Sequence, residues 1–141
     1  MKLFASTLAL FVLSSVYASD LVLSSSCAKT LLTQAFECIK ARKPTEGIAL
    51  YIQVRDHPNA EVWMIIKASA ELKSHQQQND AIIGFKRTIA RSNATESQLL
   101  YVGKVLLGMG ALELAQTAFD KVLSHPIVSN DTRQYIKDLL K

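Results

Sequence analysis

The feature of this 141-residue sequence that most constrains its fold is an internal repeat with a period of about 34 residues. Shifting the chain so that residue 35 falls on 69, and 69 on 103, aligns residues of similar size and chemistry without a gap. One column of small residues holds Ala35, Ser69 and Gly103, and a second holds Gly47, Ala81 and Ala115. The aromatic column holds Tyr51, Phe85 and Phe119, and two apolar columns hold Leu31, Ile65 and Leu99, and Cys38, Leu72 and Leu106. A fixed period of this kind indicates a chain built from stacked, similar units.

Local patterns indicate that each unit is made of helices. Apolar residues recur at spacings of three and four, and helix-breaking residues separate the periodic segments. No segment alternates in the manner of a strand, and a chain with 5 Gly and 3 Pro has neither a disordered nor a collagen-like composition. We therefore predict an all-α fold, with helices near 27–42, 44–56, 60–75, 78–91, 95–109, 112–124 and 131–140.

The small columns have a mechanical meaning. Two antiparallel helices joined by a short turn approach closely only where their facing side chains are small, and the aromatic side chain four residues later fills the neighbouring gap. One helix pair buries only part of its apolar surface, so several pairs must stack to build a continuous core. The sequence contains three such pairs.

This pattern resembles the tetratricopeptide repeat, a helix–turn–helix motif of about 34 residues with small residues at positions 8 and 20 and an aromatic residue at position 24. The third repeat carries Gly103, Ala115 and Phe119 at these positions, whereas Gly47 and Ser69 depart from the usual alanine or small residue. The family's tryptophan at position 4 is absent, and Trp63 lies two residues before its place.

The resemblance covers roughly residues 27–129. It implies a right-handed solenoid of three helix hairpins, at about 27–59, 60–93 and 94–129. Proteins with such repeats usually bind peptides or proteins and rarely catalyse reactions.

A last helix is expected after the third repeat. The sequence Asn130-Asp131-Thr132 is typical of a helix N-cap, and an apolar stripe of Tyr135, Ile136, Leu139 and Leu140 follows it. We predict that residues 130–141 form a capping helix, and a partner-binding helix is the alternative.

The amino terminus has the pattern of a secretory signal. Lys2 precedes an apolar run over residues 3–13, and small or β-branched residues precede the expected cleavage after Ala18. The run is shorter than the roughly 20 residues that span a membrane. We predict a cleaved signal over 1–18, a short linker over 19–26, no membrane span in the mature chain, and a secreted or periplasmic protein. An uncleaved anchor is the alternative.

In the family that this chain resembles, the first helix of each pair lines a concave groove. The matching positions that carry a cation or an aromatic ring are Lys29, Phe36, Lys40, Trp63, Lys67, Lys73, Tyr101 and Lys104. Lysines can pair with the carboxylates of an acidic peptide, and the rings add contact area. Solvent exposure alone also accounts for lysines on this face, so the preference for an acidic partner is a hypothesis.

Cys27 and Cys38 raise the question of a disulfide, because disulfides persist in exported proteins. On one helix, eleven residues would separate their Cα atoms by about 16 Å, more than the roughly 7 Å that a bridge allows. An internal bridge therefore requires a helix that begins after Cys27. An intermolecular bridge through Cys27 and two free thiols are the other possibilities, with Cys38 expected to be buried in its column.

The sequence lacks the motifs of catalysis, metal binding and phosphate binding. His57, His75 and His125 have no zinc-helix spacing, and neither a nucleophile elbow nor a phosphate loop is present. A net charge of +4 is also small for a nucleic-acid-binding protein. We therefore expect no enzyme activity, metal, cofactor or nucleic-acid partner. Asn93 and Asn130 match the glycosylation pattern, which matters only in a eukaryotic secretory route.

The function that these observations favour is an exported module that binds another protein or a peptide, as an adaptor, chaperone or assembly factor. One alternative is a structural protein that forms a homodimer through the exposed end of the first repeat. Another is a small secreted enzyme or inhibitor whose site has no recognisable motif.

Overall fold

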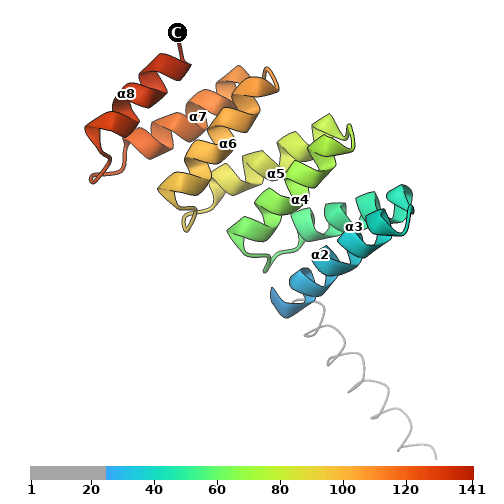
Figure 1. Ribbon diagram of the computed structural model, residues 1–141. Helices are drawn as coiled ribbons and strands as arrows, with labels where there is room; N and C mark the ends of the chain where they lie inside the picture. The colour runs from blue at the N-terminus through green and yellow to red at the C-terminus, as the bar shows by residue number, and fades with distance from the viewer. Residues whose placement is uncertain (1–24) are drawn as a thin grey trace, which may run out of the picture. The chain divides into compact units, whose positions relative to one another are not determined.

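The computed structural model describes residues 25–141, which consist of helices and short connections without any strand (Figure 1). The helices are α2 (Ser25–Lys40), α3 (Pro44–Asp56), α4 (Val62–Ser74), α5 (Gln78–Ala90), α6 (Glu96–Gly108), α7 (Leu112–Leu123) and α8 (Asn130–Leu139). The predicted all-α class is therefore confirmed for this part of the chain. The signal predicted over 1–18 and most of the linker, residues 19–24, lie outside the described residues.

Consecutive helices pack in pairs. Helix α2 contacts α3, α4 contacts α5, and α6 contacts α7, and each pair is joined by a short turn. The chain divides into two compact units, of which the amino-terminal unit runs to Glu61 and contains the pair α2–α3. The carboxyl-terminal unit begins at Val62 and contains α4 to α8, and within it α5 also contacts α6 and α7.

The helix boundaries repeat at the interval that the sequence columns indicate. Helices α3, α5 and α7 begin at residues 44, 78 and 112, and helices α4, α6 and α8 begin at 62, 96 and 130. The expected boundaries lie within two residues of these, which is the usual variation of helix ends. Helix α2 begins at Ser25, two residues before the expected start, and the Ser25 hydroxyl donates to a carboxylate oxygen of Glu61 at 3.2 Å.

The three turns within the pairs share one geometry. Each contains a residue with positive φ, and these residues are Arg42 (61°), Gln76 (63°) and Gly110 (75°). In each turn the following N–H donates to a carbonyl five residues earlier, as Lys43 to Cys38 (2.9 Å), Gln77 to Leu72 (2.9 Å) and Ala111 to Leu106 (3.0 Å). This is the Schellman arrangement, which ends a helix through a left-handed residue. Only the third turn uses glycine, so the sequence did not reveal the special role of residues 42 and 76.

The aromatic column and both small columns are buried in the described structure. Tyr51, Phe85 and Phe119 are at most 1% exposed. The six residues of the small columns are buried as well, namely Ala35, Ser69, Gly103, Gly47, Ala81 and Ala115. The buried hydroxyl of Ser69 donates to the carbonyl of Ile65 at 2.7 Å, which satisfies the one polar side chain among these six.

Two glycines in these columns mark the closest approaches. A Cβ on Gly103 would lie 2.5 Å from Cε1 of Phe119, and one on Gly47 would lie 2.6 Å from Cδ1 of Ile39. Real Cβ atoms do not approach so closely, so an alanine at either position would force the neighbouring side chain to shift. At the equivalent position of the other two pairs, Ala81 and Ala115 fit with their methyl groups fully buried. At position 47 the nearest atoms to such a Cβ belong to the side chain of Ile39, and the main-chain carbonyl of Ala35 follows at 3.0 Å.

Helix α8 follows the period in its position but not in its residues. Its N-cap is Ser129, whose hydroxyl accepts from the N–H of Thr132 at 3.1 Å, so the predicted N-cap residue Asn130 is the first helical residue instead. Ile136 is fully buried. Lys137, one period after Gly103, is exposed, and Leu140, one period after Leu106, is 40% exposed. This face of α8 therefore lacks the small residue that a second packed helix needs.

Candidate protein-binding surface

A hollow of about 300 Å³ lies between α4 and α6 in the carboxyl-terminal unit. Trp63 and Ile66 line it from α4, and Ser97, Gln98 and Tyr101 line it from α6. Trp63 is 42% exposed and Tyr101 is 46% exposed, although both are large rings that a protein core would accept. The structure thus brings together two of the aromatic residues that the sequence predicted for a groove.

The packing of the two helices explains why these side chains point outward. Helix α4 buries Met64, Ile65 and Leu72, and helix α6 buries Leu99, Val102 and Leu106. Because a helix has 3.6 residues per turn, burial of these positions leaves Trp63 and Ile66 on the other side of α4 and Tyr101 on the other side of α6.

A capping box fixes the polar edge of the hollow. The Thr95 hydroxyl accepts from the N–H of Gln98 at 3.3 Å, and the side-chain oxygen of Gln98 accepts from the N–H of Thr95 at 2.9 Å. The hydroxyls of Thr95 and Ser97 lie 3.1 Å apart and share a hydrogen bond. These contacts hold the first turn of α6, and with it the Gln98 side chain, in one geometry.

The lysines of the predicted groove differ in their surroundings. Lys67 forms an ion pair with Glu71 at 2.8 Å on the same helix. Lys104 lies over the ring of Tyr135 on α8, with 5.4 Å between its Nζ atom and the ring centroid. Lys73, near the end of α4, is exposed. The positive character of this face is therefore smaller than the lysines alone suggest, and the i,i+4 spacing of Lys67 and Glu71 was the feature of the sequence that could have indicated it.

Three of the predicted groove residues belong to α2 in the amino-terminal unit. Phe36 is 50% exposed, and the Nζ atom of Lys40 lies 5.5 Å from the centroid of its ring. Lys40 also pairs with Glu37 at 3.5 Å, and Lys29 is exposed. These residues and the lining of the hollow between α4 and α6 are on different units.

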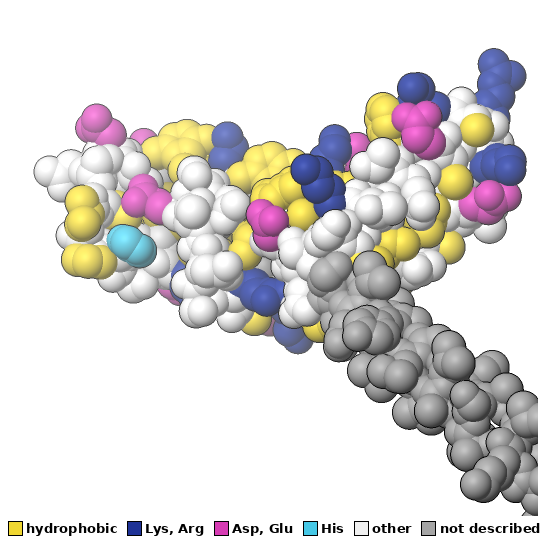
Figure 2. Space-filling view, turned by 90° about the horizontal axis from the view of Figure 1, so that it is seen from below, with side chains coloured by type: hydrophobic (Ala, Val, Ile, Leu, Met, Phe, Trp, Pro, Cys, Tyr) yellow, Lys and Arg dark blue, Asp and Glu magenta, His cyan; other side chains and the backbone are white. Residues whose placement is uncertain are grey.

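Hydrophobic side chains remain at the surface next to lysine and arginine side chains (Figure 2). Apolar atoms make up a large part of any folded protein's surface, so the binding argument depends on the individual rings at the hollow and not on this mixture.

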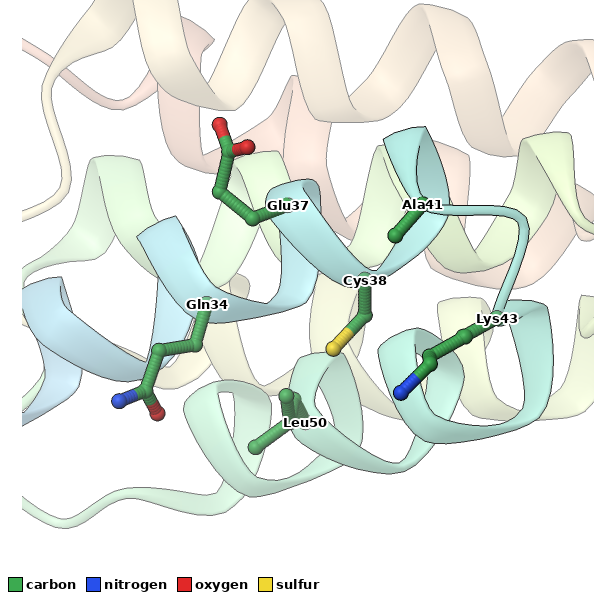
Figure 3. A pocket seen from close by; sticks show the side chains of 6 residues that line it. All are labelled: Gln34, Glu37, Cys38, Ala41, Lys43 and Leu50. Carbon is green, nitrogen blue, oxygen red and sulfur yellow. The ribbon is translucent and has the colours of Figure 1, made fainter.

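Helix α2 carries both cysteines, so the two lie about 16 Å apart along one helix, too far for a bridge within the chain. An internal disulfide would require α2 to begin after Cys27, and it begins at Ser25. Cys38 is only half-buried, in contrast to its expected burial, and it lines a second hollow on the amino-terminal unit (Figure 3). The 34-residue repeat in the sequence gave no indication of this hollow.

The histidines are dispersed. His57 is buried and its Nδ1 atom accepts from the N–H of Asn59 at 3.3 Å, His75 is half-buried, and His125 is exposed. Between residues 25 and 141, no three His, Cys, Asp or Glu side chains are grouped as a metal site. None of the helices in the same range has the length and apolarity that crossing a membrane requires.

No protein-family model, no curated protein and no solved structure matches this chain. The inference about function therefore depends on the hollow between α4 and α6, with its aromatic rings and neighbouring charges.

Proposed function

We propose that this chain is an exported helical-repeat module of the tetratricopeptide type, a right-handed solenoid of hairpins that binds a peptide or protein segment. The regular spacing of its helices and turns supports the fold assignment. The secretory pattern of residues 1–18 supports export to the periplasm or the cell exterior. An adaptor, chaperone or assembly factor is the kind of protein that fits both properties.

The observation that carries the binding function is the pair of exposed rings at the hollow. Trp63 and Tyr101 each leave more than two fifths of their surface in contact with water. This exposed apolar area does not contribute to the free energy of folding. Tryptophan and tyrosine are also the residues that dominate binding energy at protein interfaces. Covering these two rings with a partner's apolar side chain gains the stabilisation of burial.

The shape of the hollow favours part of a longer chain over a small molecule. Ligand pockets have volumes of about 300–1,000 Å³ and enclose most of the ligand. This hollow is at the lower limit, near 300 Å³, and opens widely to solvent. It fits one bulky side chain of an extended segment, whose neighbours then lie along α4 and α6.

Charge adds a preference to this binding. Lys104 lies on α6 about one helical turn after Tyr101, and its ammonium group lies over the ring of Tyr135. An acidic residue of the partner, next to the side chain that fills the hollow, can pair with this ammonium group. Lys67 can pair with a carboxylate of the partner only after its ion pair with Glu71 breaks. Because an exposed ion pair contributes about 1 kcal/mol or less, the expected preference for an acidic segment is moderate.

The fluorescence of Trp63 provides the test, because it is the single tryptophan of the chain. The probes are acetylated and amidated peptides with a central Leu or Phe, flanked by Glu, Gln or Lys in otherwise identical sequences. We expect a saturable change of Trp63 emission that is strongest for the Glu-flanked peptides. The charge reversals Lys67→Glu and Lys104→Glu, combined in one variant, should remove the advantage of Glu.

The matched control is an exposed apolar residue on another helix. Tyr101→Ala should weaken peptide binding, whereas Ile83→Ala on α5, where the side chain is 49% exposed, should leave it unchanged. Absence of a saturable change with every peptide, or equal effects of the two substitutions, would contradict the proposed function.

A further inference from the structure

The hairpin of α2 and α3 carries a second surface hollow, with a volume of about 400 Å³. Its lining combines an apolar floor with charged edges and consists of Gln34, Glu37, Cys38, Ala41, Lys43 and Leu50 (Figure 3). We call this surface the α2–α3 face. It belongs to the amino-terminal unit and is separate from the residues that line the hollow between α4 and α6.

The α2–α3 face exposes residues that are buried elsewhere in the repeat. Cys38 precedes Leu72 and Leu106 by one and two periods, and both leucines are fully buried whereas Cys38 is half-buried. Likewise Leu31 is half-buried, although Ile65 and Leu99 in its column are buried. The α2–α3 hairpin thus has the apolar pattern of a packed element but leaves part of it in water, where a partner's side chains can cover it.

The edges of this face carry opposite charges. In Figure 3, Cys38 lies between Glu37, on α2, and Lys43, at the turn before α3. Glu37 pairs with Lys40 at 3.5 Å and Lys43 pairs with Glu46 at 3.8 Å, and all four side chains are about 60% exposed. Such loose, solvated pairs contribute little, so either charge can change partners at small cost.

A surface with one positive and one negative edge is complementary to itself. Because Glu37 and Lys43 lie on either side of Cys38, a copy turned by 180° about an axis near Cys38 would bring its Lys43 toward Glu37 and its Glu37 toward Lys43, so that the same contact would form twice. This is the isologous arrangement of twofold dimers. We propose that a second copy of this chain docks on the α2–α3 face, with Cys38 and Leu50 covered at the centre and the two charge pairs at the edges.

The size of the face sets the expected strength. Helices of 16 and 13 residues are about 24 Å and 20 Å long, and two adjacent helices are about 20 Å wide, so each copy contributes roughly 450 Å². A stable interface usually takes about 800 Å² from each partner. The dimer is therefore weak and concentration-dependent, with dissociation in the micromolar range or above.

Sedimentation equilibrium of the purified protein tests this proposal, with charge-reversal variants at Glu37 and Lys43. Mass spectrometry defines the amino terminus of each sample. Glu37→Lys and Lys43→Glu each place like charges together, and each should weaken dimerisation about tenfold. The combined variant restores opposite charges and should return most of the affinity. Lys86→Glu on α5 changes the net charge as Lys43→Glu does and should leave the dimer unchanged.

A crosslinking experiment locates the contact independently. In a Cys27→Ser background, a short bis-maleimide should join Cys38 of two copies, and Glu37→Lys should lower the yield of that product at the same protein concentration. A protein that stays monomeric at every concentration overturns the proposal, as does a dimer that neither responds to the charge variants nor crosslinks through Cys38. These outcomes are independent of peptide binding in the hollow between α4 and α6.

Discussion

Lys121, on α7, donates a hydrogen bond from its ammonium group to the main-chain carbonyl of Ile89, in the last turn of α5, at 2.5 Å. The same ammonium donates to the carbonyl of Arg91 at 3.3 Å. Carbonyls at the end of a helix have no partner within the helix, and the helix dipole favours a positive charge there. A side chain from the next hairpin thus ends α5 and ties the two hairpins of the carboxyl-terminal unit together.

Replacing this lysine should measure the strength of that link. Lys121→Met keeps the apolar part of the side chain but removes the charged donor, so we expect a loss of about 1–2 kcal/mol in the free energy of unfolding. Urea denaturation followed by circular dichroism measures it. Lys86→Met, at an exposed position of α5, should change stability by less than about 0.5 kcal/mol. Equal effects of the two substitutions would show that the link contributes nothing.

Two glycines of α6 should respond in opposite ways to the same substitution. In Gly103→Ala the new Cβ would lie 2.5 Å from the ring of Phe119, which is fully buried. We expect a net loss of about 1–2 kcal/mol, because overpacking exceeds the gain in helix propensity. Nothing lies within 4 Å of a Cβ on Gly108, so Gly108→Ala should be neutral or stabilising by up to about 1 kcal/mol. Thermal denaturation compares them.

The clash predicted for Gly47→Ala has a specific cause, which a double-mutant cycle can isolate. The nearest atoms to a Cβ at this position belong to the side chain of Ile39, and the carbonyl of Ala35 follows at 3.0 Å. Gly47→Ala should therefore destabilise the protein, and it should do so by about 1 kcal/mol less in an Ile39→Ala background. An equal cost in both backgrounds would assign the clash to the main chain.

The left-handed turn residues predict a pair of opposite effects. Gln76 has φ 63° and Gly110 has φ 75° in equivalent turns. A side chain in this conformation costs about 1 kcal/mol relative to glycine. Gln76→Gly should stabilise the protein by up to about 0.5 kcal/mol, since the more flexible unfolded chain offsets part of the gain. Gly110→Ala should destabilise it by about 1 kcal/mol. Melting temperatures that move in the same direction would contradict this explanation.

Helix α8 offers a comparison of two apolar residues. Ile136 is fully buried and Leu140 is 40% exposed. Ile136→Ala should cost about 2–4 kcal/mol, because it removes a buried side chain and leaves a cavity, whereas Leu140→Ala should cost less than about 1 kcal/mol. Hydrogen exchange of the α8 amides distinguishes loosening of this helix from global unfolding. Similar costs for both residues would mean that α8 is not packed as described.

The positions of the helices could be predicted from the sequence because they depend on local patterns. The three- and four-residue spacing of apolar side chains placed every helix between residues 25 and 141 within two residues of its observed bounds. The turns were located by their breaking residues, but their geometry was not. Arg42 and Gln76 adopt the left-handed conformation only because a hydrogen-bonded helix end imposes it, and neither residue type indicates this by itself.

The surroundings of the candidate site residues were less predictable, since they depend on contacts between helices. The period placed Trp63 and Tyr101 on outward faces, but the ring of Tyr135 beneath Lys104 comes from α8, two helices further along the chain. Cys38 was assigned to a buried column because the period treats all repeats alike. The first repeat is different, because Cys38 is smaller than the leucines of its column and a hollow opens beside it.

Lys137 occupies the place on α8 where earlier helices have Ala35, Ser69 or Gly103. In the earlier pairs, this is the position at which the second helix approaches most closely, as Gly103 does with Phe119. A helix packed in the same way on α8 would have to strip the water from an ammonium group and leave it unpaired, which is costly. The single substitution of a small residue by lysine therefore makes this side of α8 a surface that stays in water.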